Sequence, residues 1–160
     1  MVAAGQVAYP YLYTALIALA YGLMLPAIAI LHPRHGRHRE SGTILATITG
    51  NAAVTVGLGG SVNVDLQPAA LFVLGMWWWT IGKLWAETVV LPRGLGVATA
   101  GIGALAIAGT LVAAVNVGLS AVVPAVPAIA TWSISQLVLG GWLIALGLTF
   151  RRTAAGLTSG

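Results

Sequence analysis

The chain has 160 residues, of which 59% are hydrophobic and 6% are charged. A soluble domain of this size needs more charged side chains to cover its surface, so the composition excludes that class and predicts an integral membrane protein. The net charge is +4 and there is no cysteine, which excludes disulfides, thiolate nucleophiles and thiolate-ligated metal centres.

Long apolar segments account for most of the chain. A membrane-spanning helix needs about 20 apolar residues, and segments of that kind lie near residues 7–31, 42–60, 69–91, 95–119 and 128–150. We therefore expect an all-α integral membrane bundle of five transmembrane helices, forming one domain over residues 1–150, with a short cytoplasmic tail over residues 151–160. The last part of this tail, residues 153–160, is small and polar and should be loosely ordered. The first segment has no basic residue ahead of it and is too long for a secretory signal core, which indicates a retained helix.

The segment 42–60 is the least hydrophobic of the five. Thr43, Thr47, Asn51 and Thr55 recur there every four residues, which places them along one side of a helix. An uncompensated amide in the middle of a bilayer is costly. We therefore expect this stripe, with Asn51, to face the interior of the bundle and the helix to be central.

The basic residues test the orientation of the chain. Six of them follow the first, third and fifth segments, and the connections after the second and fourth contain no lysine or arginine; the six are Arg34, Arg37, Arg39, Arg93, Arg151 and Arg152. With five spans these positions share one side, and positive loops stay in the cytoplasm. We expect the N-terminus outside, the C-terminus in the cytoplasm and a multi-pass location in a bacterial inner (plasma) membrane. This topology accounts for the basic charge of the chain, so no nucleic-acid partner is predicted.

The third segment carries an acid and a base inside the apolar stretch. Lys83 lies about 15 Å from Arg93 along a helix, near the bilayer centre, and Glu87 follows four residues later on the same face. Polar residues on this and other segments lie at similar depth, so the candidate intramembrane polar layer comprises Lys83, Glu87, Asn51, Thr80, Tyr21 and Gln136. Either Lys83 and Glu87 neutralise each other and fix helix packing, or they line a path for a proton or small solute.

The opposite face of the same segment is aromatic. It combines Trp78 and Trp85 with Gly75 and Gly82, whose missing side chains leave notches. We interpret it as a packing face toward lipid or a partner subunit. The alternative is a surface for a flat hydrophobic molecule such as a quinone or carotenoid.

Three histidines, His32, His35 and His38, follow the first segment at intervals of three residues. We expect Pro33 and Gly36 to break the helix there, and the arginines between the histidines oppose a cation. The sequence therefore predicts a solvated loop facing lipid headgroups and no metal site.

These patterns favour a non-enzymatic membrane protein, an accessory or scaffold subunit that packs against lipids, other integral membrane subunits or copies of itself. They contain no catalytic residue set, and no cofactor is predicted beyond a bound lipid, quinone or carotenoid. The first alternative is a proton or small-solute transporter that uses Lys83 and Glu87. A third hypothesis is an intramembrane lipid-modifying enzyme with Glu87 and a loop histidine as its acid–base pair.

Overall fold

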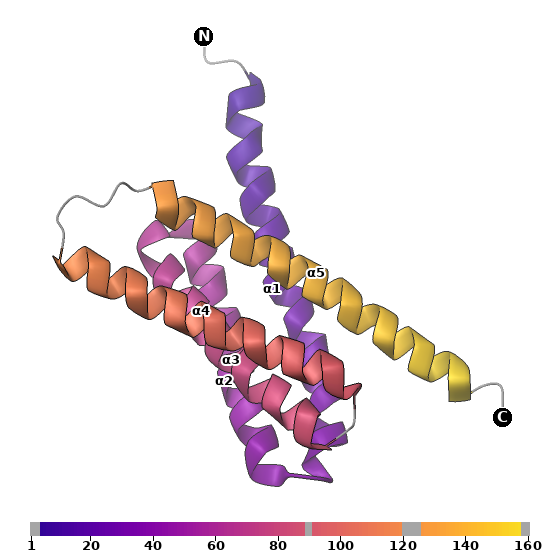
Figure 1. Cartoon of the computed structure of the whole chain (residues 1–160). Coiled ribbons are helices and arrows are strands. Elements are labelled where there is room, and N and C mark those ends of the chain that lie inside the picture. The colour runs from indigo at the N-terminus through magenta and orange to yellow at the C-terminus, as the bar shows by residue number, and fades with distance from the viewer. Residues whose placement is uncertain (1–3, 89–90, 120–125, 158–160) are drawn as a thin grey trace. The chain divides into compact units, whose positions relative to one another are not determined.

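The computed structural model describes residues 4–88, 91–119 and 126–157, and these residues are almost entirely helical (Figure 1). The elements are α1 (Ala4–Gly36), α2 (Glu40–Val62), a short 3-10 turn η1 (Val64–Leu66), α3 (Gln67–Thr88), α4 (Arg93–Leu119) and α5 (Val126–Leu157). Four of the five α-helices contain a stretch long and apolar enough to cross a membrane: Leu12–Gly36, Glu40–Val62, Arg93–Val112 and Ile134–Arg151. The described part of the chain is therefore compatible with a multi-pass membrane protein.

The chain divides into two compact units, residues 1–124 with α1 to α4 and residues 125–160 with α5. In the first unit α2 packs against α1 and α3, and α3 packs against α2 and α4. Successive helices run in opposite directions, so the α1–α2 and α3–α4 turns lie at one end of this unit and the α2–α3 turn lies at the other (Figure 1). The central position expected for the second helix is thus shared by α2 and α3.

The helix α3 does not reach the hydropathy of a membrane span, although it is long enough. Its tryptophans, together with Lys83 and Glu87, lower its mean hydropathy. Trp77, Trp78 and Trp85 are nevertheless fully buried between the neighbouring helices. The large aromatic side chains of α3 therefore lie in an apolar environment because the neighbouring helices cover them, although the hydropathy of α3 alone is below that of a membrane span.

The helix α1 continues through Pro33 to Gly36, so the break expected at the histidines is wrong. Pro33 is exposed and lies in the last turn, where the missing N–H removes a single helical hydrogen bond. The chain then turns sharply, because the carbonyl of His35 accepts hydrogen bonds from the N–H groups of His38 and Arg39, both at 2.9 Å. His35, which was expected in a loop, is therefore part of a packed helix.

The connection between the second and third expected segments contains a short helical turn, and the last helix is longer than expected. The polar segment 61–68 contains η1, in which the side-chain oxygen of Asn63 accepts a hydrogen bond from the N–H of Asp65 at 3.0 Å. The last helix, α5, extends to Leu157. Residues 153–157, which were expected to be loosely ordered, are therefore helical.

The helices α3 and α4 touch through their backbones. A Cβ added to Gly75 of α3 would lie 3.0 Å from the carbonyl oxygen of Gly103, and one added to Gly96 of α4 would lie 2.9 Å from that of Gly82. In each helix the two glycines are seven residues apart, which is two helical turns. This repeat of small residues lets the two backbones approach, as in closely packed membrane helices.

Candidate functional site

Within the unit of α1 to α4, the members of the predicted polar layer lie in separate local environments. Tyr21 is fully buried, and its ring lies where a Cβ on Gly57 of α2 would stand. Thr80 is half-buried, and its hydroxyl donates to the carbonyl of Met76 in its own helix at 2.8 Å. Gln136 belongs to α5, in the other unit, and donates to the hydroxyl of Ser135 at 3.2 Å. Tyr21 and Thr80 therefore make local contacts at different places in the first unit.

Lys83 and Glu87 do not pair with each other in the described chain. Glu87 forms an ion pair with Arg39, which precedes α2. The ammonium group of Lys83 lies 5.5 Å from the ring centroid of Trp79, a cation–π arrangement within α3. Both Lys83 and Glu87 are exposed. The spacing of four residues allows a direct pair between Lys83 and Glu87. The antiparallel packing of α2 and α3 instead places the guanidinium of Arg39, at the α1–α2 turn, beside Glu87.

The polar stripe of α2 does not face the interior along its length. Thr43 is buried and Thr47 is half-buried, whereas Asn51 and Thr55 are exposed. Four residues turn a helix by about 400°, so a strict spacing of four drifts by about 40° at each step. The expectation that Asn51 faces the interior is therefore wrong for this chain. The stripe starts in the core and winds onto the surface.

Asn51 belongs to a different regular stripe, which we call the outer face of α2. Its members are exposed and alternate at intervals of four and three residues: Ile44, Ile48, Asn51, Thr55, Leu58 and Val62, with Thr55 donating to the backbone carbonyl of Asn51 at 3.0 Å. The Asn51 side chain makes no hydrogen bond within the described residues. An amide with two donors and an acceptor oxygen is thus presented at the middle of a helix that is long and apolar enough to cross a membrane.

The aromatic face of α3 is covered by α4 of the same chain. A Cβ on Gly82 would lie 2.7 Å from the carbonyl oxygen of Gly96, and Trp78 and Trp85 are both buried. Trp85 also stacks on His35 of α1, with ring centroids 6.5 Å apart and an angle of 28° between the planes. The surface considered for a quinone or carotenoid is therefore filled by packed helices.

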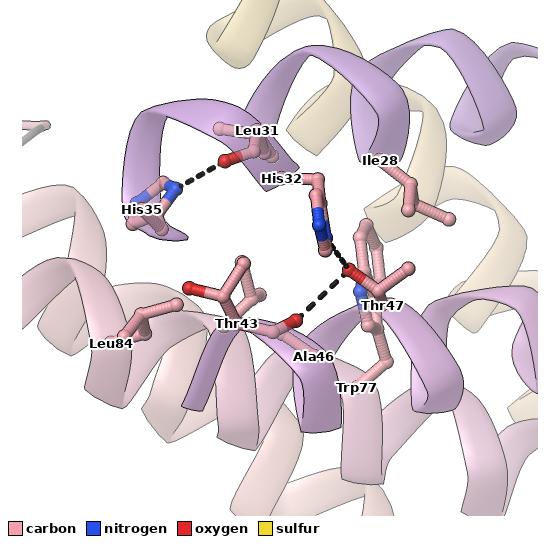
Figure 2. A pocket seen from close by; sticks show the side chains of 10 residues that line it. Ile28, Leu31, His32, His35, Thr43, Ala46, Thr47, Trp77 and Leu84 are labelled. Carbon is pink, nitrogen blue, oxygen red and sulfur yellow. Dashed lines mark hydrogen bonds between the residues drawn. The ribbon is translucent and has the colours of Figure 1, made fainter. Parts of the chain in front are cut away.

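A small cavity with a polar rim lies between α1, α2 and α3, near the end that carries the α1–α2 turn (Figure 2). It holds about one water-sized group, and its lining comprises Ile28, Leu31, His32, His35, Thr43, Ala46, Thr47, Trp77, Ile81 and Leu84. The residues from α3 are buried and form its floor, whereas His32 is exposed and Thr47 is half-buried. The cavity therefore opens between α1 and α2.

The hydrogen bonds around the cavity fix the orientation of both imidazoles. The hydroxyl of Thr47 donates to the carbonyl of Thr43 at 2.9 Å, so at 2.7 Å from Nδ1 of His32 it acts as the acceptor. The carbonyl of Leu31 can only accept, so Nδ1 of His35 donates to it at 2.8 Å. In the neutral imidazole the second nitrogen is then an acceptor.

His35 and its second nitrogen are a feature of the candidate site that sequence reasoning missed. The residue is fully buried, and its Nε2 has no hydrogen-bond partner in the described part of the chain. A signal was present, because His35 continues the buried positions of α1 at alternating intervals of four and three residues: Ile17, Tyr21, Met24, Ile28, Leu31 and His35. The expectation of an exposed loop holds for His38 but not for His35.

The end of the unit that carries the cavity is basic. The exposed side chains of Arg34, Arg37 and Arg39 surround the α1–α2 turn, and Arg93 begins α4 at the same end. The acids on these two turns of the described chain are Glu40 and Glu87. No cluster of three metal-ligating side chains occurs among the described residues.

Comparisons of the chain with protein-family models, with curated proteins and with solved structures found no match.

Proposed function

We propose that the chain is a non-enzymatic membrane subunit that assembles with a second copy of itself through the outer face of α2. The observation that carries this proposal is the exposed amide of Asn51 on a helix of membrane-spanning length. A polar side chain facing lipid is costly unless it finds a hydrogen-bonding partner, and helix association supplies one.

A second copy fits this face better than an unrelated partner. An amide both donates and accepts, so Asn51 is complementary to Asn51 of a copy related by a two-fold axis along the membrane normal. Asn51 lies near the middle of α2, where the symmetric partner lies at the same depth. The alternation of four and three residues along the outer face is the pattern of a two-helix coiled coil, in which one central asparagine fixes the register.

The arrangement of the charged residues favours assembly over transport. The transporter hypothesis needs Lys83 and Glu87 to line a path, but Glu87 is engaged by Arg39 and Lys83 by the Trp79 ring, on exposed surfaces. The lipid-modifying hypothesis needs Glu87 beside a histidine as an acid–base pair, and its ion-pair partner is an arginine instead. Assembly needs none of these groups to titrate.

Single-cysteine crosslinking tests the proposal directly, because the chain contains no cysteine of its own. Ile48→Cys places a thiol one turn before Asn51 on the outer face, and Leu105→Cys is a matched control on the exposed side of α4. Mild oxidation of membranes should give a disulfide-linked dimer of the full chain with Ile48→Cys and little with Leu105→Cys. Adding Asn51→Leu to Ile48→Cys should reduce the yield several-fold, in line with about 1–2 kcal/mol for an interhelical polar contact.

Equal crosslinking at the two positions would refute the outer face as an interface. An adduct of Ile48→Cys with a different protein, identified by mass spectrometry, would refute self-association and leave a hetero-assembly role.

We further propose that all five helices span a bacterial inner membrane, with the basic turns in the cytoplasm and the N-terminus outside. The α1–α2 and α3–α4 turns carry Arg37, Arg39 and Arg93 at one end, and the α2–α3 turn carries no basic residue. Basic loops are retained on the cytoplasmic side. The helix α3 has 22 residues, or about 33 Å, which matches a bilayer core.

A further inference from the structure

The first turn of α2 carries an acid on the side of the helix that faces away from α1 and α3. Glu40 lies four residues before Ile44, about one helical turn, so it continues the outer face of α2 toward the α1–α2 turn (Figure 1). Its side chain is exposed and forms no ion pair within the described residues. An unpaired carboxylate therefore lies at the beginning of the outer face.

Self-association through the outer face would bring two of these carboxylates together, and the present inference rests on that proposed function. Around a two-fold axis along the membrane normal, the same residues of both copies lie at one level, and packed helices are about 8–10 Å apart. Like charges that face each other across an interface oppose association. A dimer that buries Asn51 therefore needs a positive group beside Glu40.

Arg37 is the nearest cation along the chain that is not already engaged. It lies in the α1–α2 turn, three residues before Glu40, and its exposed side chain has no ion pair or hydrogen bond within the described residues. The other arginine of this turn, Arg39, forms an ion pair with Glu87 of α3. Arg37 and Glu40 do not pair with each other in the described chain, so each can bind a group of a second copy.

We propose that Arg37 of each copy pairs with Glu40 of the other, so that two ion pairs flank the two-fold axis where the paired α2 helices begin. The arrangement is self-complementary, because each copy offers one cation and one anion. Ion pairs beside paired helices set partner choice and orientation. In an antiparallel pair Glu40 would meet the α2–α3 connection, which contains no lysine or arginine, so only the parallel arrangement pairs both charges.

Charge reversal tests this pairing in full chains that also carry Ile48→Cys. Arg37→Glu leaves two acids at this end of the outer face and Glu40→Arg leaves two cations, so each variant alone should crosslink about fivefold less than the chain with Ile48→Cys only. When the two variants, distinguished by tags of different size, are mixed in one membrane, the acids of one face the cations of the other. Mixed dimers should then form well above the random proportion.

A gain on mixing reports a contact between copies, because the fold of each copy is the same alone and in the mixture. Arg93→Glu is the matched control, since it reverses an exposed arginine at the same end of the unit but on α4. Mixed with Glu40→Arg, it should give no excess of mixed dimers. If a reversal variant does not fold, the neutral variants Arg37→Gln and Glu40→Gln provide a second measurement, because their effects on the dimer yield should be non-additive.

The possible failures are distinguishable. A random proportion of mixed dimers, while the chain with Ile48→Cys alone still crosslinks, would overturn the Arg37–Glu40 pairs and leave self-association intact. An equal excess of mixed dimers with Arg93→Glu would also overturn the pairs, because it would indicate a general effect of charge at this end. Absence of the crosslink in the chain with Ile48→Cys alone would refute the outer face as an interface, and the ion pairs with it.

Discussion

Gly103 of α4 is the position where the smallest possible change should have a large effect on stability. A Cβ there would lie 2.6 Å from the carbonyl oxygen of Gly75 and 2.9 Å from the carbonyl carbon of Trp78. Optimal contacts between carbon atoms are about 3.5–4.0 Å. Because the atoms in the way are backbone, no side chain can rotate aside, and Gly103→Ala must push α3 and α4 apart along their contact.

The size of the effect follows from two opposing terms. Overpacking of this kind costs about 1–3 kcal/mol, while replacing glycine by alanine inside a helix gains about 1 kcal/mol from propensity. Gly109→Ala, on the same helix, isolates the second term, since a Cβ at that exposed position meets nothing within 4 Å. We therefore expect Gly109→Ala to be neutral or stabilising and Gly103→Ala to be about 1–3 kcal/mol less stable than Gly109→Ala.

Unfolding of the purified chain in mixed micelles, titrated with a denaturing detergent, measures this difference. Tryptophan fluorescence reports the transition, because Trp78 and Trp85 are buried beside the contact. Gly101→Ala gives a further control two residues from Gly103, where a Cβ also meets nothing within 4 Å. Equal stability of Gly103→Ala and the two control variants would refute the backbone contact between α3 and α4.

Two more predictions concern the charged residues and the orientation. In double-mutant cycles of the unfolding free energy, the effects of Lys83→Met and Glu87→Leu should be additive. The effects of Arg39→Met and Glu87→Leu should couple by about 0.2–1 kcal/mol at low salt, as for an exposed ion pair. A coupling between Lys83 and Glu87 larger than that between Arg39 and Glu87 would indicate a direct Lys83–Glu87 pair instead. An impermeant thiol reagent added to intact cells should label Asn63→Cys and spare Gly36→Cys, and the reverse pattern would invert the proposed topology.

The sequence alone located the helices well, because the length and hydrophobicity of a segment are local properties. All five expected segments correspond to helices, and Gly75 and Gly82 marked a face that tolerates close approach. The break expected at Pro33 does not occur, because local propensity does not include the tertiary packing of this last turn of α1. His35 is buried against Trp85 of α3, a contact fifty residues away in the chain.

The tertiary structure decided which side chains meet. Lys83 and Glu87 are correctly spaced to pair, yet the antiparallel turn delivers Arg39 to Glu87. Asn51 shares a four-residue spacing with Thr43, but the drift of about 40° per step separates them, so one is in the core and the other on the surface. The composition and spacing of a segment determine that a helix forms and how long it is. The rotation of the helix about its axis and its neighbours depend on contacts between segments that are distant in the sequence. These contacts therefore determine which partner each polar side chain can bind.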